Sequence, residues 1–191
     1  MPVGAVLCGG RSSRMGRDKA FVEYDGVPMA RRVADALRAA GCDPVAAVGG
    51  DAEGLRRLGL DPVPDGWPGE GPVGGVRTAL ERWPEADAVV AVACDLPRLT
   101  AATVTRLLDA LAGAPTAVAA VAVTDRDEPL CVAWRPAASP SLAAAMGAGE
   151  RRLHAVLAAT ACVRVAVDLQ DLANVNAPSD LGTNLSPHVD P

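Results

Sequence analysis

The chain has 191 residues, half of them hydrophobic, which is enough apolar material for the core of one domain of ordinary size. Its formal net charge of −5 argues against a protein that binds nucleic acid through a general positive field. The five cysteines are widely spaced and contain no Cys-x-x-Cys pair, which excludes a zinc ribbon and argues against a disulfide framework. We therefore expect a soluble cytoplasmic protein that has neither a nucleic-acid partner nor a membrane partner.

Strand-like and helical patterns alternate along the chain. In the first half we expect a strand at Val3–Leu7, a short strand at 21–24, a helix at 29–40, a strand at Val45–Val48, a helix at 52–58 and an extended segment at 61–64. In the second half we expect a glycine-rich loop at 69–75 leading into a helix that ends at 83, a strand at 88–93, a helix from the N-cap Thr100 to 111, strands at 116–123 and 130–134 around a turn at 125–129, helices at 141–146 and 152–159, a strand at 163–167 and a weak helix from 180.

This alternation predicts an α/β fold with a mostly parallel central sheet and helices on both faces. No repeat or linker divides the chain, so we expect one domain at 1–183 and a disordered tail at 184–191. Ligands in such sheets bind beyond the carboxyl ends of the strands. Three loops follow such ends, at 8–19, 65–75 and 94–97, and we expect them to converge on one crevice.

The first of these loops has an unusual composition. It contains three glycines, two hydroxyls and four cationic side chains in the sequence Leu7-Cys8-Gly9-Gly10-Arg11-Ser12-Ser13-Arg14-Met15-Gly16-Arg17-Asp18-Lys19. Glycine lets a ligand approach the main chain, and successive exposed N–H groups form a concave anion site. The loop therefore favours a site for a triphosphate, the alternative being an exposed arginine-rich turn.

Lys19 strengthens this interpretation, because the chain contains seventeen arginines and one lysine. Lysine is a compact point charge on a flexible stem, whereas arginine is a planar fork. The loop is not a Walker A loop, since Lys19 is followed by Ala20, and the Gly-x-Gly-x-x-Gly fingerprint of dinucleotide-binding folds is absent.

The pattern Leu-x-Gly-Gly-x-Ser-x-Arg-Met-Gly-x-Asp-Lys resembles the nucleotidyltransferase superfamily, and its Gly-Gly and Asp-Lys variants are those of the molybdenum cofactor guanylyltransferases. The resemblance implies a three-layer Rossmann-like nucleotidyltransferase fold and extends in order from residue 3 to 181. It also implies that backbone N–H groups of Leu7, Cys8, Gly9 and Gly10 hold the nucleotide. Arg14 and Lys19 would then neutralise phosphate charge during catalysis.

Asp95 directly follows the most apolar predicted strand. A carboxylate there is costly unless it is paired or holds a metal ion, and Mg²⁺ typically takes one or two carboxylates together with phosphate oxygens and water. An ordinary loop or N-cap carboxylate is the alternative. The segment Cys-Asp-Leu-Pro resembles the Asp-x-Pro metal motif of the same family, which implies that Asp95 binds Mg²⁺ and is catalytic.

The segment after the third predicted strand offers a place for the nucleoside. Asp65 is either a turn residue of Pro-Asp-Gly or an acceptor for the donors of guanine, and the choice between base and ribose stays open. The stretch containing Gly71 and Gly74 resembles the family's Gly-Pro-Leu-x-Gly loop, which lies beside the base. Gly49 stands where the family often has Asn, so one nucleotide contact is in doubt.

Two later segments resemble parts of the family that face the pterin. Asn174 and Asn176 are two residues apart, so in an extended segment both face the same side, and a helix-capping turn is the alternative. Arg151 and Arg152 either bind an anionic pterin group or form a solvated start of a helix.

The resemblance implies transfer of GMP from GTP to molybdopterin, with release of pyrophosphate and formation of the guanine dinucleotide cofactor. Its expected substrates are GTP and molybdopterin, and transient contact with cofactor-delivering proteins or molybdoenzymes is compatible with that role. The nearest alternatives are a cytidylyltransferase for the same pterin and a sugar-phosphate nucleotidyltransferase. An alternative of another class is a non-catalytic nucleotide-binding regulator or cofactor carrier.

Overall fold

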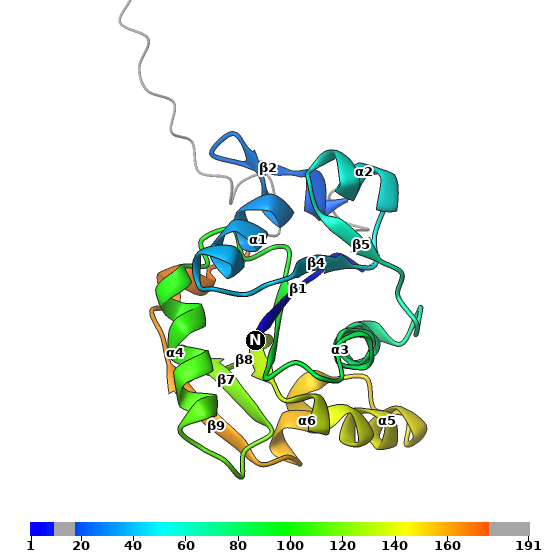
Figure 1. Cartoon of the computed structure of the whole chain (residues 1–191), viewed down its shortest axis with the longest axis vertical. Coiled ribbons are helices and arrows are strands. Elements are labelled where there is room, and N and C mark those ends of the chain that lie inside the picture. The colour runs from blue at the N-terminus through cyan, green and yellow to red at the C-terminus, as the bar shows by residue number, and fades with distance from the viewer. Residues whose placement is uncertain (10–17, 176–191) are drawn as a thin grey trace, which may run out of the picture.

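A computed structural model of the chain describes residues 1–9 and 18–175. Seven strands form one sheet in the order β5-β4-β1-β6-β8-β7-β9 (Figure 1). They are β1 (Val3–Leu7), β4 (Val45–Val48), β5 (Asp61–Val63), β6 (Val89–Ala93), β7 (Ala119–Val123), β8 (Asp127–Trp134) and β9 (Cys162–Ala166). A separate antiparallel pair joins β2 (Glu23–Tyr24) to β3 (Val27–Pro28).

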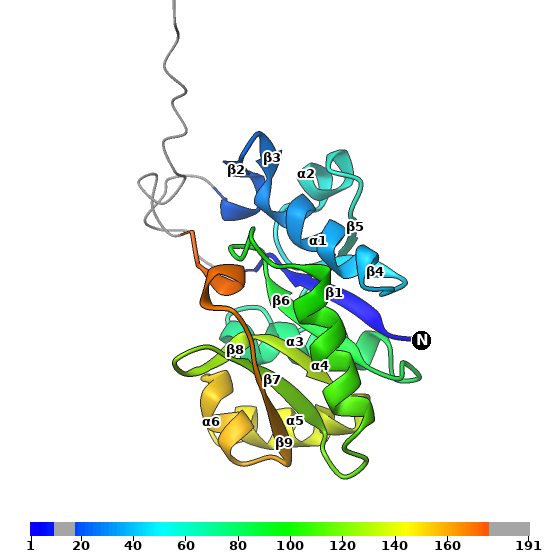
Figure 2. The same ribbon diagram turned by 90° about the vertical axis from the view of Figure 1, so that its left-hand side faces the viewer.

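Helices cover both faces of the seven-stranded sheet, as Figures 1 and 2 show from two directions. One face carries α1 (Met29–Ala39), α2 (Ala52–Arg57) and α4 (Ala101–Ala112). The other face carries α3 (Gly71–Arg82), α5 (Ser139–Gly147) and α6 (Leu153–Ala158). Short 3₁₀ helices occur at η1 (Lys19–Phe21), η2 (Pro136–Ala138) and η3 (Leu169–Leu172).

Side-chain alternation along β1 explains the three layers. Val3, Ala5 and Leu7 pack in the cluster beneath α3, whereas Val6 and Cys8 pack in the cluster beneath α1. Because successive side chains of a strand point to opposite faces, a strand that is apolar at every position must be covered on both sides. The expected α/β fold with helices on both faces is confirmed.

The sheet is mostly parallel, also as expected, and β8 is its antiparallel member. β1 pairs in parallel with β4 and β6, β4 with β5, and β7 with β9. β8 runs antiparallel to both β6 and β7. The first residues of β8 therefore lie near the carboxyl end of β6, on the ligand-binding edge of the parallel strands.

Arg135 closes the far end of α4. Its guanidinium group donates to the carbonyl oxygens of Leu111 at 2.7 Å and Ala114 at 3.0 Å. The last carbonyls of a helix have no partner within the helix, and a cation there interacts favourably with the helix dipole. The contact joins the loop after β8 to α4.

Several element boundaries differ from the sequence-based prediction. Phe21 lies in η1 and not in a strand, because Asp18 accepts a hydrogen bond from the Ala20 N–H and caps a helical turn there. α3 already begins at Gly71, with proline in its first turn, so 71–75 is helical and not a loop. β8 begins at residue 127, inside the predicted turn. The short helix η3 was not predicted, and the helix from 180 and the tail at 184–191 lie outside the described residues.

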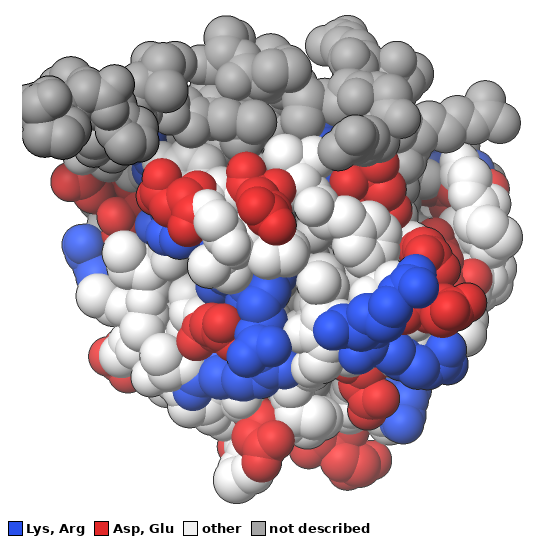
Figure 3. All heavy atoms as spheres, turned by 90° about the horizontal axis from the view of Figure 1, so that it is seen from above, with Lys and Arg blue, Asp and Glu red and all other residues white. Residues whose placement is uncertain are grey.

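The described surface mixes the two signs of charge. On α1, Asp35 pairs with Arg31 at 2.9 Å and with Arg38 at 3.0 Å. In Figure 3, Lys and Arg side chains likewise lie beside Asp and Glu side chains. None of the helices within the described ranges is both long enough and apolar enough to cross a membrane.

Candidate active site

A cavity of about 1100 Å³ opens at the carboxyl ends of β5, β4, β1 and β6. The strand register pairs Val63 with Val48, Val48 with Leu7, and Leu7 with Ala93. The three loops that were expected to converge do meet at this cavity. Its lining residues are Leu7, Cys8, Gly9, Asp18, Lys19, Val48, Gly49, Gly50, Asp65, Pro68, Gly69, Gly71, Pro72, Gly75, Ala93, Cys94, Asp95 and Leu130.

Lys19 and Asp95 form an ion pair at the β1–β6 side of the cavity. Lys19 Nζ lies 2.9 Å from Asp95 Oδ2, and the two side chains are 21% and 16% exposed. Lys19 is placed by η1, whose N-cap is Asp18, and Asp95 lies two residues beyond the end of β6. The partial burial lowers the effective dielectric constant and strengthens the attraction between the two charges.

The other carboxylate oxygen of Asp95 differs from the one that pairs with Lys19. Asp95 Oδ1 is buried and has no hydrogen-bond partner among the described residues. A buried charged oxygen without a partner is costly, so the site fits a divalent cation. Within 1–9 and 18–175, no group of three or more His, Cys, Asp or Glu side chains could hold a metal ion.

A segment from the far end of the sheet steadies the Asp95 loop. The Val175 N–H donates to the Asp95 carbonyl at 3.1 Å. Upstream, Asp171 Oδ2 accepts from the hydroxyls of Thr100 at 2.8 Å and Thr103 at 2.6 Å, at the start of α4. Asn174, adjacent to Val175, is exposed beside this loop.

Asp65 occupies the opposite side of the cavity, two residues beyond β5. Its Oδ1 accepts from the Trp67 N–H at 2.9 Å and from the Thr78 hydroxyl at 3.1 Å. Its Oδ2 lies on the Gly9 side, 3.8 Å from where a β-carbon on Gly9 would be. One oxygen of Asp65 is therefore held by the protein and the other faces the cavity.

Gly49 is required by the backbone packing between β4 and β1. Its φ is +74°, and an added β-carbon would lie 3.0 Å from Gly9 Cα and 3.1 Å from Gly9 N. A side chain such as the family's Asn would therefore be strained and would press on the Gly9 backbone. The chain thus differs from the family at residue 49, where the backbones of Gly49 and Gly9 approach each other closely.

Gly71 and Gly74 lie in different places relative to the cavity. Gly71 lines the cavity, whereas Gly74 is not one of the lining residues. A β-carbon on Gly74 would lie 2.8 Å from the Trp67 carbonyl oxygen. Gly74 thus lets α3 pack closely against the loop that carries Asp65.

The backbone at the end of β1 takes part in the sheet. The Cys8 N–H donates to the Val48 carbonyl at 2.9 Å. Cys8 also lines the cavity, and its contact with the nucleotide stays a prediction. The pKa of the Cys8 thiol is raised well above its usual range. The larger cause is a hydrogen bond with the Cys94 thiol, and burial is the second. Cys8 is therefore neutral at physiological pH.

Arg151 and Arg152 are engaged within the protein. Arg151 forms an ion pair with Glu70 and donates to the Met146 carbonyl at 2.9 Å. Arg152 donates to Glu150 at 2.9 and 2.8 Å, and this contact lowers the pKa of the Glu150 carboxyl to about 2. These contacts join Arg151 to the end of α5 and to Glu70, and they favour the interpretation of a solvated start of a helix for Arg152.

Three predicted site residues, Gly10, Arg14 and Asn176, lie outside the described residues. The residues in or behind the cavity that sequence reasoning missed include Leu130 and Thr78. Leu130 reaches the cavity because β8 lies next to β6, a pairing that local sequence does not indicate. Thr78 looks like an ordinary helical position in the sequence.

Comparison with known proteins agrees with this geometry. Residues 4–165 match the family described as "MobA-like NTP transferase domain". A molybdenum cofactor guanylyltransferase of Rhodobacter capsulatus is 36% identical over 93% of this chain and 92% of its own.

Two solved structures share the fold. The molybdopterin-guanine dinucleotide biosynthesis protein A of Archaeoglobus fulgidus has a TM-score of 0.77 at 24% identity, over 95% of each chain. A Mycobacterium tuberculosis protein solved as a complex with manganese has a TM-score of 0.64 at 23% identity, over 87% of this chain and 88% of its own. From the family match and the relative that spans nearly the whole chain, we conclude that this protein belongs to the MobA-like NTP transferase domain family.

Proposed function

We propose that this protein transfers GMP from GTP to molybdopterin and releases pyrophosphate. The observation that carries the proposal is the arrangement of charges along one cavity. Lys19 and Asp95 pair at the β6 end, where the other Asp95 oxygen is buried with no partner among residues 1–9 and 18–175, and a single carboxylate oxygen of Asp65 faces the cavity at the β5 end. The guanylyltransferase name of the 36% identical relative supports the choice of substrates.

Asp65 and Asp95 lie at separate ends of the cavity. Asp65 and Asp95 follow strands that are three positions apart in the sheet, and neighbouring strands are about 4.8 Å apart, so the two sites are separated by roughly 14 Å. We place the nucleoside near Asp65 and the phosphates near Lys19 and Asp95. This orientation directs the anionic end toward the lysine.

The reaction needs no covalent intermediate with the protein. A terminal phosphate oxygen of molybdopterin attacks the α-phosphorus of GTP, and pyrophosphate leaves on the opposite side. Lys19 neutralises charge on the phosphoryl oxygens, and the cavity walls hold the reacting groups in line. Asp95 Oδ1 would hold a Mg²⁺ ion, which supplies Lewis-acid stabilisation of the phosphates when bound.

The proposal also includes a binding position for the pterin acceptor and a location for the protein in the cell. We propose that residues 1–183 act as one domain in the cytoplasm and that Asn174 and Asn176 approach the pterin. The position of Asn174 next to Val175, whose N–H bonds the Asp95 carbonyl, supports an acceptor that enters beside Asp95. Transient contact with proteins that deliver or receive the cofactor is compatible with this placement.

The test is release of pyrophosphate by the full chain with molybdopterin and either GTP or CTP, in the presence of Mg²⁺. We expect turnover with GTP, little with CTP, and a loss of about 10²–10³ in kcat for Asp95→Asn. Turnover with CTP in preference to GTP would identify a cytidylyltransferase. Binding of GTP without turnover in the presence of molybdopterin would refute the enzymatic role.

A further inference from the structure

Thr78 is a buried hydroxyl placed directly behind the cavity. In the described part of the chain, the buried polar side chains are those of Thr78 and Thr103, and Thr78 is only 7% exposed. Its Oγ1 accepts from the Gly66 N–H at 3.1 Å and lies 2.9 Å from the Gly74 carbonyl oxygen and 3.1 Å from Asp65 Oδ1. A buried hydroxyl with three polar partners is fixed in position.

These contacts divide the two oxygens of Asp65 between protein and ligand. A hydroxyl has one proton, and a carboxylate is a stronger acceptor than a carbonyl, so the Thr78 proton favours Asp65 Oδ1. The Trp67 N–H donates to the same oxygen at 2.9 Å. Rotation of the carboxylate would break both bonds, and Oδ2 therefore stays directed toward the cavity on the Gly9 side.

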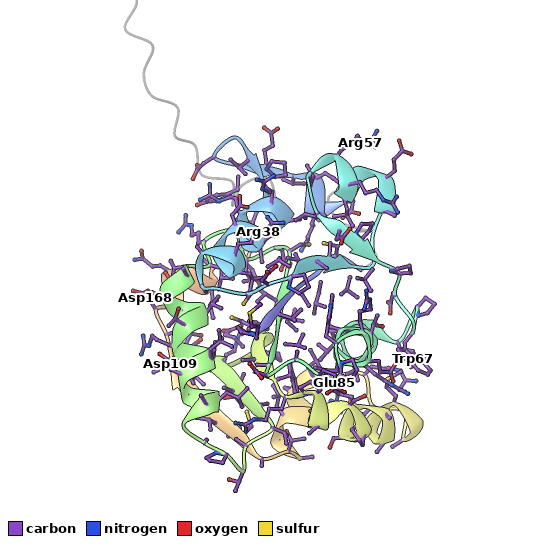
Figure 4. All side chains as sticks on the ribbon, in the orientation of Figure 1. Arg38, Arg57, Trp67, Glu85, Asp109 and Asp168 are labelled. Atoms are coloured by element: carbon purple, nitrogen blue, oxygen red, sulfur yellow. The ribbon has the colours of Figure 1, made fainter. Side chains whose placement is uncertain are left out.

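The same helix also holds the loop that carries Asp65. The Arg77 guanidinium stacks on the Trp67 ring at 3.7 Å, and Glu81 accepts from Arg77 at 2.7 Å and from the Trp67 indole N–H at 3.2 Å. Figure 4 shows Trp67 beside α3, on the side away from α1 and α4. One turn of α3 thus fixes both the loop and the carboxylate.

We propose that Thr78 is a positioning residue that sets nucleoside selectivity by directing Asp65 Oδ2 at one hydrogen-bond donor of the nucleoside. This inference rests on the proposed function, because it assumes that the nucleoside lies near Asp65. The donor is the exocyclic 2-amino group of guanine or the 2′-hydroxyl of the ribose. Both are neutral donors to a carboxylate, and nucleotide analogues that lack one or the other separate them.

The experiment measures dissociation constants of GTP, inosine triphosphate and 2′-deoxyguanosine triphosphate for the full chain, together with kcat and KM for GTP. The variants are Thr78→Val, which removes the hydroxyl at nearly constant shape, and Thr78→Ser, which keeps it. Thr160→Val is the control for loss of a threonine hydroxyl, since Thr160 donates to the Leu157 carbonyl at 3.2 Å and is not one of the residues that line the cavity.

For the original chain, the analogue that lacks the contacted donor binds more weakly than GTP. In Thr78→Val we expect the dissociation constant and KM for GTP to rise on the order of tenfold, with kcat changed less than about twofold. We also expect the ratio between the two analogues to fall toward one. Thr78→Ser and Thr160→Val should keep the original ratio.

A double-mutant cycle separates positioning from general stability. In an Asp65→Ala background, Thr78→Val should change GTP affinity less than about twofold, because the group through which it acts is gone. Full additivity of the two effects, or an unchanged analogue ratio in Thr78→Val, would overturn the inference. Since affinity is measured directly, absence of turnover in the original chain would refute the proposed reaction without touching this comparison.

Discussion

Replacing Lys19 with methionine is expected to change metal binding and catalysis in opposite directions. Without nucleotide, Lys19 Nζ lies 2.9 Å from Asp95 Oδ2 and competes with a cation for that carboxylate. At this distance and an effective dielectric constant of about 20, the Coulomb attraction is about 6 kcal/mol, much of it offset by the desolvation of two partly buried charges. Lys19→Met should therefore bind a divalent cation more tightly in the absence of GTP.

The magnitude follows from the net strength of the pair. If about 1.4 kcal/mol of net attraction survives desolvation, removing it strengthens metal binding about tenfold. With GTP bound, the lysine is expected to contact phosphate instead, and its loss should lower kcat by about 10²–10³. Metal affinity without GTP tests Lys19 in the empty site, and kcat tests it in the site that holds GTP.

Free Mn²⁺ can be followed by electron paramagnetic resonance, with and without a non-reacting GTP analogue, beside a pyrophosphate assay. Arg57→Met serves as a control, because the pair between Arg57 and Glu53 is 70% and 80% exposed and lies on the surface. Weaker Mn²⁺ binding by Lys19→Met in the absence of nucleotide would contradict the competition argument. Undiminished kcat would contradict the catalytic role of Lys19.

Two further predictions concern the rest of the fold. Arg135→Met should lower the free energy of unfolding by about 2 kcal/mol, because it removes charge-assisted hydrogen bonds to the carbonyls of Leu111 and Ala114 at the end of α4. Chemical denaturation measures this change, with Arg106→Met at an exposed position as the control. A titration followed by nuclear magnetic resonance should find the Glu150 carboxyl with a pKa of about 2, lowered mainly by its hydrogen bond with Arg152, and Arg152→Gln should return it toward its ordinary value of 4.5. Since the folded pKa is depressed, this contact stabilises the protein fully above about pH 4.5 and is lost as the pH falls toward 2. A Glu150 carboxyl with its ordinary pKa would contradict the second prediction. Equal losses of unfolding free energy in Arg135→Met and Arg106→Met would contradict the first.

Most helices and strands were predicted from the sequence, because apolar runs and capping residues are properties of short stretches of chain. The apolar runs of β1 and β4 have the predicted bounds, and Thr100 caps α4 as predicted, with its hydroxyl accepting from the Thr103 N–H. The start of α3 was misplaced because glycines disfavour helix in general, whereas here Gly74 is needed for close packing against Trp67. Tertiary packing overrode propensity at that point.

The candidate site was predictable where it depends on strand ends and not where it depends on pairing between distant segments. Lys19, Asp65 and Asp95 follow or precede recognisable elements, so their convergence follows from the edge of a parallel sheet. The insertion of β8 beside β6, which brings Leu130 to the cavity, depends on contacts between residues far apart in sequence. The contact of Thr78 with Asp65 likewise appears only when α3 is docked.

The hydrogen bond from Val175 to the Asp95 carbonyl has a consequence for the order in which the protein is made. Every described residue that lines the cavity, up to Leu130, leaves the ribosome before Val175 does. At roughly 5–20 residues per second, the 45 residues from 131 to 175 take about 2–9 seconds to synthesise. During that interval a nascent chain carries the described groups of the cavity wall, yet the loop of Asp95 still lacks its hydrogen bond from Val175, and translation must pass β9 before that bond can form.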